Sequence, residues 1–206
     1  MRIITISREF GSGGRELGKR LADLLCFDYY DSEIISAVAQ KSGMDEQYVA
    51  DALRDHGWRS QPITFRGTLS SAAYLQASRI NLLLDQKKVL EEIAALGKDC
   101  VIVGRNADVI LREYRPFNVF VCAAAEAKLR RCRERAGKGE NLSDRELLRK
   151  MKQIDRNRAQ TRELMTGSDW GDRACYHLTV NTTGWEIKEL APAVADFAER
   201  WFGGQA

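Results

Sequence analysis

The sequence has few of the residues that usually build metal sites or disulfide frameworks. It contains five cysteines and two histidines among 206 residues. No two cysteines stand in a CxxC or similar pair, and His56 and His177 are too far apart to suggest a metal site or a catalytic triad. We expect the cysteines to be reduced thiols. A zinc site, a disulfide scaffold and histidine-based nucleophilic catalysis are therefore not expected.

Long apolar runs are also missing at the beginning of the chain. The apolar run at residues 1–6 turns polar at Ser7, which makes it too short for a signal peptide or a membrane span. The net charge of +3 is too small to indicate a nucleic-acid partner by itself. We therefore expect a cytoplasmic protein with neither a membrane nor a nucleic acid as partner. The sequence leaves the oligomeric state open.

Apolar residues make up 44% of the chain and charged residues 30%, which suits one globular domain spanning residues 1–206. Short β-branched runs alternate with long helical stretches, a pattern that predicts an α/β fold with a central parallel sheet. Strands are expected at residues 2–6, 27–30, 100–103, 118–122 and 177–181. Helices are expected at residues 16–25, 32–42, 45–56, 68–96, 125–136, 144–165 and 185–201, with a loop at 57–67.

A glycine-rich loop follows the first predicted strand and opens the first predicted helix. Glycines in this context let backbone N–H groups and the helix N-terminus approach an anion, so the loop predicts a phosphate site. A structural strand–turn–helix without a ligand is the alternative interpretation. The residues expected to bind the nucleotide are Gly11, Ser12, Gly13, Gly14, Arg15 and Glu16.

The loop departs from the standard phosphate-binding pattern GxxxxGK[ST]. Aligned on its glycines, Gly14 stands at the lysine position, and neither Arg15 nor Glu16, which follow it, carries the magnesium-binding hydroxyl. A loop of this kind that binds a nucleotide would need another cation near the phosphates, and Arg8, Arg15 and Lys19 are candidates. Arg15 is the nearest of the three in sequence.

A basic segment lies in the second half of the chain. Residues 128–162 carry thirteen lysines or arginines against five acidic residues. Arg131 and Arg135 are one helical turn apart, and two glycines bracket the nearby Lys138. Such a segment predicts a helical basic lid, at about residues 128–158, that closes over a phosphate-bearing ligand. A solvated basic helix face is the alternative.

Three stretches, in order along the chain, resemble the cytidylate kinase-like proteins. They are SREFGSGGRE at residues 7–16, VIVGRNAD at 101–108 and DRNRA at 155–159. The resemblance implies a P-loop kinase-type three-layer fold with an acceptor-binding helical region at about residues 31–97. It implies phosphoryl transfer from ATP, with Mg²⁺, to a nucleoside monophosphate, CMP or dCMP.

The same resemblance implies roles for particular residues. Those expected at the acceptor are Asp31, Gly104, Arg105, Asp108, Asp155 and Arg158. Together with Arg15 of the loop and Arg131 and Arg135 of the basic segment, the matched Arg156 and Arg158 are expected to act on the transferring phosphate, because a guanidinium binds two phosphate oxygens and stays charged. A non-catalytic nucleotide-binding module and a small-molecule kinase with another acceptor remain the alternatives.

Overall fold

A computed structural model describes residues 1–31, 33–43, 70–136 and 142–204. Its strands are β1 (Ile3–Arg8), β2 (Asp28–Tyr30), β3 (Cys100–Val103), β4 (Phe117–Cys122) and β5 (Leu178–Asn181). Its α-helices are α1 (Gly14–Leu25), α2 (Glu33–Ser42), α4 (Ser70–Ala95), α5 (Ala107–Ile110), α6 (Ala125–Glu134), α7 (Asp144–Thr166) and α8 (Ile187–Gly203). Short 3-10 helices lie at Arg112–Tyr114 and Arg173–Cys175.

The five strands form one parallel sheet in the order β2-β3-β1-β4-β5. In the register of the central strand, Ile4 pairs with Val101 of β3 on one side and with Phe117 of β4 on the other. Carboxyl ends of parallel strands share one edge of a sheet, so the loop after β1 lies between the loops after β3 and β4. This edge is where open α/β sheets bind ligands.

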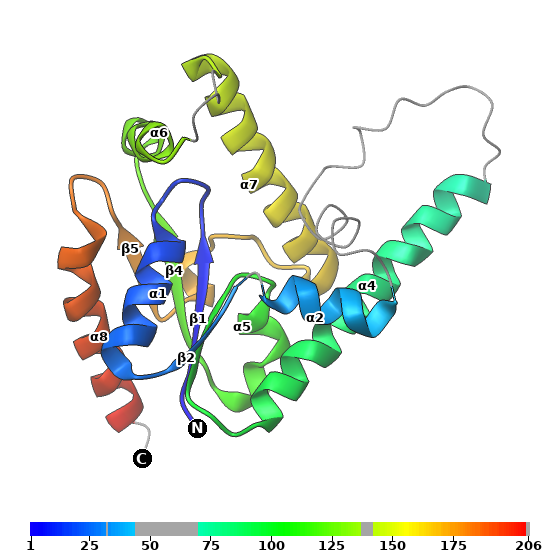
Figure 1. Cartoon of the computed structure of the whole chain (residues 1–206), viewed down its shortest axis with the longest axis horizontal. Coiled ribbons are helices and arrows are strands. Elements are labelled where there is room, and N and C mark those ends of the chain that lie inside the picture. Colours follow the sequence, from blue (N-terminus) through cyan, green and yellow to red (C-terminus); the bar gives the residue numbers. More distant parts are fainter. Residues whose placement is uncertain (32, 44–69, 137–141, 205–206) are drawn as a thin grey trace.

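Helices cover both faces of the sheet, which gives three layers (Figure 1). Ile4 and Ile6 of β1 point to the face covered by α1 and α8, whereas Ile3 points to the face covered by α2, α4 and α5. All three side chains are at most 1% exposed. Each such burial contributes about 1.5–3 kcal/mol, which explains why the strands are apolar on both faces. The predicted α/β fold with a parallel sheet is confirmed.

Most predicted elements are present with small shifts of their ends. β1 continues two residues further than predicted, to Arg8, and α1 begins earlier, at Gly14. At α7, a reciprocal capping box between Ser143 and Glu146 fixes the first turn. α5 was not predicted, because four residues are too few to show helical periodicity. The predicted helix at 45–56 and loop at 57–67 lie outside the described residues.

Among the described residues, no helix combines the length and the apolar character needed to cross a bilayer.

Candidate active site

The loop between β1 and α1 has the backbone shape of an anion cradle. Gly11 and Gly13 have φ values of +78° and +86°, which glycine adopts without the steric cost that a side chain brings. Gly13 is the N-cap of α1 and offers no side-chain acceptor to the first turn. The N–H groups of residues 14–16 therefore lack an intrahelical partner and point out of the helix N-terminus. This arrangement suits phosphate oxygens.

Close packing of the loop also requires glycine. A Cβ at Gly13 would lie 2.5 Å from Cδ1 of Ile187, and a Cβ at Gly11 would lie 3.0 Å from Sγ of Cys132. α8 and α6 thus press directly on the loop backbone. Any side chain at Gly13 would have to displace a buried isoleucine.

Hydrogen bonds from distant parts of the chain hold the loop in place. The Ser12 hydroxyl donates to the carbonyl oxygen of Glu9 at 2.8 Å, and the Thr182 hydroxyl donates to the carbonyl oxygen of Ser12 at 2.7 Å. Asp155 accepts from the N–H of Phe10 at 2.8 Å, and Arg158 donates to the carbonyl oxygen of Arg8 at 2.8 Å. The loop is therefore preorganised.

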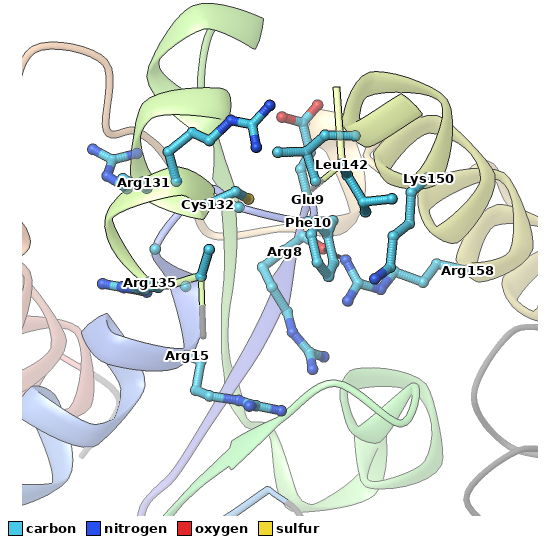
Figure 2. A pocket seen from close by; sticks show the side chains of 16 residues that line it. Arg8, Glu9, Phe10, Arg15, Arg131, Cys132, Arg135, Leu142, Lys150 and Arg158 are labelled. Atoms are coloured by element: carbon cyan, nitrogen blue, oxygen red, sulfur yellow. Dashed lines mark hydrogen bonds between the residues drawn. The ribbon is translucent and has the colours of Figure 1, made fainter. Parts of the chain in front are cut away.

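A pocket of about 300 Å³ opens above this loop. Figure 2 shows it bordered by α6 on one side, which carries Arg131 and Cys132, and by α7 on the other, which carries Lys150 and Arg158. Among the residues that the structure describes, seven basic side chains and one carboxylate, that of Glu9, line the pocket. The basic residues are Arg8, Arg15, Arg131, Arg133, Arg135, Lys150 and Arg158. Such a lining favours a polyanionic ligand.

The two arginines predicted on α6 differ in their contacts. Arg131 is 6% exposed and donates to the Thr182 carbonyl oxygen at 2.6 Å, to the Thr182 hydroxyl at 2.9 Å and to the Trp185 carbonyl oxygen at 3.0 Å. Arg135 is about half exposed and forms an ion pair with Glu16, which also binds Arg20 at 2.9 Å. Arg131 ties α6 to the turn after β5, so its action on phosphate stays a prediction, as does that of Arg135.

Asp155 and Arg158 lie together, as their predicted spacing requires. Their side chains are 3.0 Å apart, and both contact the backbone of the phosphate-binding loop. Burial raises the pKa of Asp155, although the Phe10 N–H and Arg158 oppose that shift. The pair positions the loop and Arg158 also lines the pocket. Arg156 on the same helix is exposed and is not among the lining residues.

Asp31 at the end of β2 is buried beside two arginines of the loop region. Its carboxylate lies 2.5 Å from Nε of Arg15 and 3.7 Å from Arg8. The Arg15 side chain is 69% exposed, whereas that of Arg8 is 17% exposed. The structure thus brings the predicted Asp31 and Arg15 together, and adds Arg8 to them.

The stretch after β3 contributes a left-handed turn. Gly104, Arg105 and Asn106 have φ values of +78°, +61° and +50°. Further along, Asp108 is 5% exposed and forms a buried ion pair with Arg162 of α7. Asp108 is absent from the lining of the pocket at the loop, so its predicted contact with the acceptor stays a prediction.

Three contacts near the site were not predicted from the sequence. Glu9 accepts from Lys128 at 2.9 Å and from the Ala123 N–H at 3.2 Å, which joins the loop to α6 and to the end of β4. Arg162 holds Asp108. Arg162 lies one turn beyond Arg158 on α7, a helical spacing that is visible in the sequence.

ATP fits this site better than a protein-bound magnesium ion does. The N–H groups of the loop and the basic lining would hold the phosphates. The three carboxylates nearest the loop, those of Glu9, Glu16 and Asp31, are each paired with lysine or arginine, and the Ser12 hydroxyl is fully buried. In the described parts of the chain, no three metal-ligating side chains gather. Mg²⁺ would therefore depend mainly on nucleotide phosphates and water.

The sheet order, the glycine loop and the basic pocket together define a P-loop kinase fold. Residues 3–184 match the cytidylate kinase-like family, so the chain belongs to that family. Membership supports phosphoryl transfer in general and leaves the acceptor open. None of the curated proteins matches the chain.

Solved structures show the same fold. An uncharacterized protein from Eubacterium ventriosum is 21% identical, with a TM-score of 0.70, and the match covers 97% of this chain and 99% of the other. Shikimate kinase from Acinetobacter baumannii, solved with shikimate, is 16% identical with a TM-score of 0.54, covering 96% and 92%. Shikimate kinase from Bacteroides thetaiotaomicron is 16% identical with a TM-score of 0.55, covering 96% and 98%.

Proposed function

We propose that this protein transfers the γ-phosphoryl group of ATP to a nucleoside monophosphate, with CMP or dCMP as the first candidates. The observation that carries the proposal is the basic pocket over the glycine loop, at the carboxyl edge of the sheet. Phosphoryl transfer needs positioned phosphates and neutralised oxygens, with little covalent work by the protein. Preorganised N–H groups and convergent arginines supply both.

The acceptor side of the proposal rests on the ends of β2 and β3. Asp31, Arg15 and Gly104-Arg105 lie next to the donor loop, so an acceptor held there would meet the terminal phosphate of ATP. Positive charge from Arg8, Arg15 and Arg105 suits an acceptor that is itself anionic, as a monophosphate is. This leaves a carboxylate-bearing small molecule as a competing acceptor.

A non-catalytic nucleotide-binding role is the second candidate. It is favoured by Gly14 at the lysine position and by Glu16, whose carboxylate is engaged by Arg20 and Arg135. Under this proposal the loop would bind ATP without transferring phosphate.

A panel of acceptors separates these functions. The protein is incubated with ATP and Mg²⁺ and with CMP, dCMP, UMP, AMP or shikimate, and phosphorylated product is followed by chromatography. We expect product with CMP or dCMP. Product with shikimate alone would reassign the acceptor, and saturable ATP binding without any product would favour the non-catalytic role.

Two alanine variants test whether the loop is the ATP site. Gly13→Ala combines a positive φ with a 2.5 Å clash, whereas Gly97→Ala has a similar φ of +70° and nothing within 4 Å. We expect Gly13→Ala to weaken ATP binding, measured by calorimetry, at least about tenfold, roughly 1.4 kcal/mol. Gly97→Ala should bind ATP as the parent does. Equal affinity in both variants, with both folded, would remove the loop from the site.

A further inference from the structure

The phosphate-binding loop lacks a lysine at Gly14, and the structure shows what fills that place. A Cβ built on Gly14 would lie 2.5 Å from Cβ and 3.0 Å from Cγ of Arg8. Gly14 is a helical residue without a positive φ, so its backbone conformation accepts any side chain. Space therefore excludes a side chain at position 14, because the Arg8 stem already occupies it.

The Arg8 guanidinium reaches the junction between the donor loop and the acceptor side. Its Nη1 lies 1.8 Å from where a Cβ on Gly104 would stand, and its Nη2 lies 3.7 Å from Asp31. The head group thus covers the end of β3 and faces the end of β2. Figure 2 shows it extending from β1 toward the region that Arg15 also reaches. An acceptor at Asp31 and a phosphate on the loop would meet here.

The charges around Arg8 leave positive charge in excess. Burial and the charge of Arg158 lower its pKa, Asp31 opposes this, and Arg105 and Arg15 lower it further, to about 9. The group is still charged at neutral pH. Asp31 is shared by Arg8 and Arg15, and Asp155 pairs with Arg158, so the clustered guanidinium groups still repel one another. An anion bound among them would relieve this repulsion.

We propose that Arg8, the last residue of β1, replaces the missing lysine and binds the phosphoryl group that is transferred from ATP. This inference rests on the proposed function. In the step, the bond from the γ-phosphorus to its bridging oxygen breaks, and that oxygen keeps the electron pair. A new bond forms to an ionised oxygen of the acceptor phosphate, so no proton has to move. The positive charge of Arg8 stabilises the negatively charged oxygens of the phosphoryl group during its transfer.

Other cations fit this role less well. Arg15 is largely exposed, and its Nε is 2.5 Å from Asp31. Arg131 is buried against carbonyl oxygens. Arg158 donates to the loop backbone and to Asp155, at 2.8 and 3.0 Å. Within the described parts of the chain, the Arg8 head group pairs with one carboxylate, that of Asp31, at the long distance of 3.7 Å.

The test exchanges the two positions. Arg8→Met keeps the stem and removes the charge, and we expect kcat to fall at least about 100-fold, with the KM for ATP changed less than about tenfold. Arg8→Gly/Gly14→Lys restores the first glycine and the lysine of the standard pattern, and Arg8→Gly/Gly14→Met is its uncharged match. We expect the lysine version to exceed the methionine version at least about tenfold in kcat. Arg200→Ala, an exposed arginine on α8, should behave as the parent.

Melting temperatures and circular dichroism identify variants that fail to fold, and kcat is compared among folded proteins. Arg8→Met with a kcat within about threefold of the parent would overturn the inference. So would a lysine double variant no faster than its methionine match, because a purely structural Arg8 would not be replaced by a cation from position 14. A parent that transfers phosphate to no acceptor would instead defeat the proposed function.

Discussion

Arginines in two regions of this molecule have different surroundings, although the sequence presents them alike. On α6 and α7, Arg131 and Arg162 are 6% and 3% exposed, and their guanidinium groups donate to carbonyl oxygens or to a carboxylate of the protein. At the ends of β1 and α1, Arg8 and Arg15 share the carboxylate of Asp31 beside the pocket. We infer that the surroundings of an arginine, rather than its place in a basic segment, distinguish a structural role from the proposed binding role.

The largest effect on stability is expected when the buried ion pair between Arg162 and Asp108 is broken. Arg162→Met leaves the Asp108 carboxylate buried without its partner, and we expect the free energy of unfolding to fall by about 3–5 kcal/mol. Urea denaturation measures this loss. The double variant Arg162→Met/Asp108→Leu should recover most of it, since no uncompensated charge then remains. If Arg162→Met is as stable as the parent, Arg162 does not have the structural role that we assign to it.

A smaller loss of stability is expected at Arg131. Arg131→Met removes the hydrogen bonds to Thr182 and Trp185, and hydrogen bonds from a charged group are worth about 1.5–3 kcal/mol. The same denaturation experiment applies. Arg130→Met, whose side chain is 60% exposed on the same helix, should change stability by less than about 0.5 kcal/mol. If Arg131→Met has unchanged stability but a reduced kcat, Arg131 acts on the ligand and not on the stability of the fold.

A variant at Arg15 tests the proposed binding role of the arginines beside Asp31. Arg15→Ala removes a charge that lies beside Asp31, and we expect turnover to fall about tenfold, which corresponds to roughly 1.4 kcal/mol. Steady-state kinetics with ATP and the best acceptor measure the change. Arg20→Ala, five residues further along α1 and paired with Glu16, should leave turnover within about twofold of the parent. Equal effects of the two variants would argue against a specific role for Arg15.

The smallest effect is a pH dependence at the opposite end of the sheet. Burial lowers the pKa of His177, whose Nδ1 accepts from the Asn118 N–H at 2.9 Å. On acidification below about 6.5 the unfolded chain takes up the proton first, so stability falls as the pH falls. Melting temperatures at pH 7.5 and 5.5 would show this. The component should disappear in His177→Gln, while ATP binding at pH 7.5 stays unchanged.

The strands were the most predictable part of the fold, for a physical reason. Strands buried on both faces must be apolar at almost every position, and this leaves a strong local signal. Cys100–Val103 has the predicted bounds, and the other strands differ from prediction by one or two residues. α5 gave no such signal, because its four residues follow a left-handed Asn106.

The site was predictable in its loop and less so in its partners. The glycines at 11, 13 and 14 marked the phosphate-binding loop, because close backbone approach permits little else. The contacts of the other site residues could not be predicted, because their partners lie far away in the sequence. The Arg8 side chain occupies the space left by the absent side chains of Gly14 and Gly104. Neither contact can be inferred from the spacing of residues in the sequence. Arg131 and Asp108 were recognisable as polar residues in a basic or motif context, but their buried partners were not.

The contacts that hold the phosphate-binding loop also set when it can acquire its shape. Phe10 and Asp155 are 145 residues apart, Arg8 and Arg158 150, and Ser12 and Thr182 170. Contacts of such long range form late in folding, because the chain entropy of closing large loops must be overcome first. On the ribosome the motif emerges 145 residues before Asp155, and its contacts to α7 and to the end of β5 form only after those elements have been synthesised. A nascent chain therefore carries the motif long before it can hold a nucleotide.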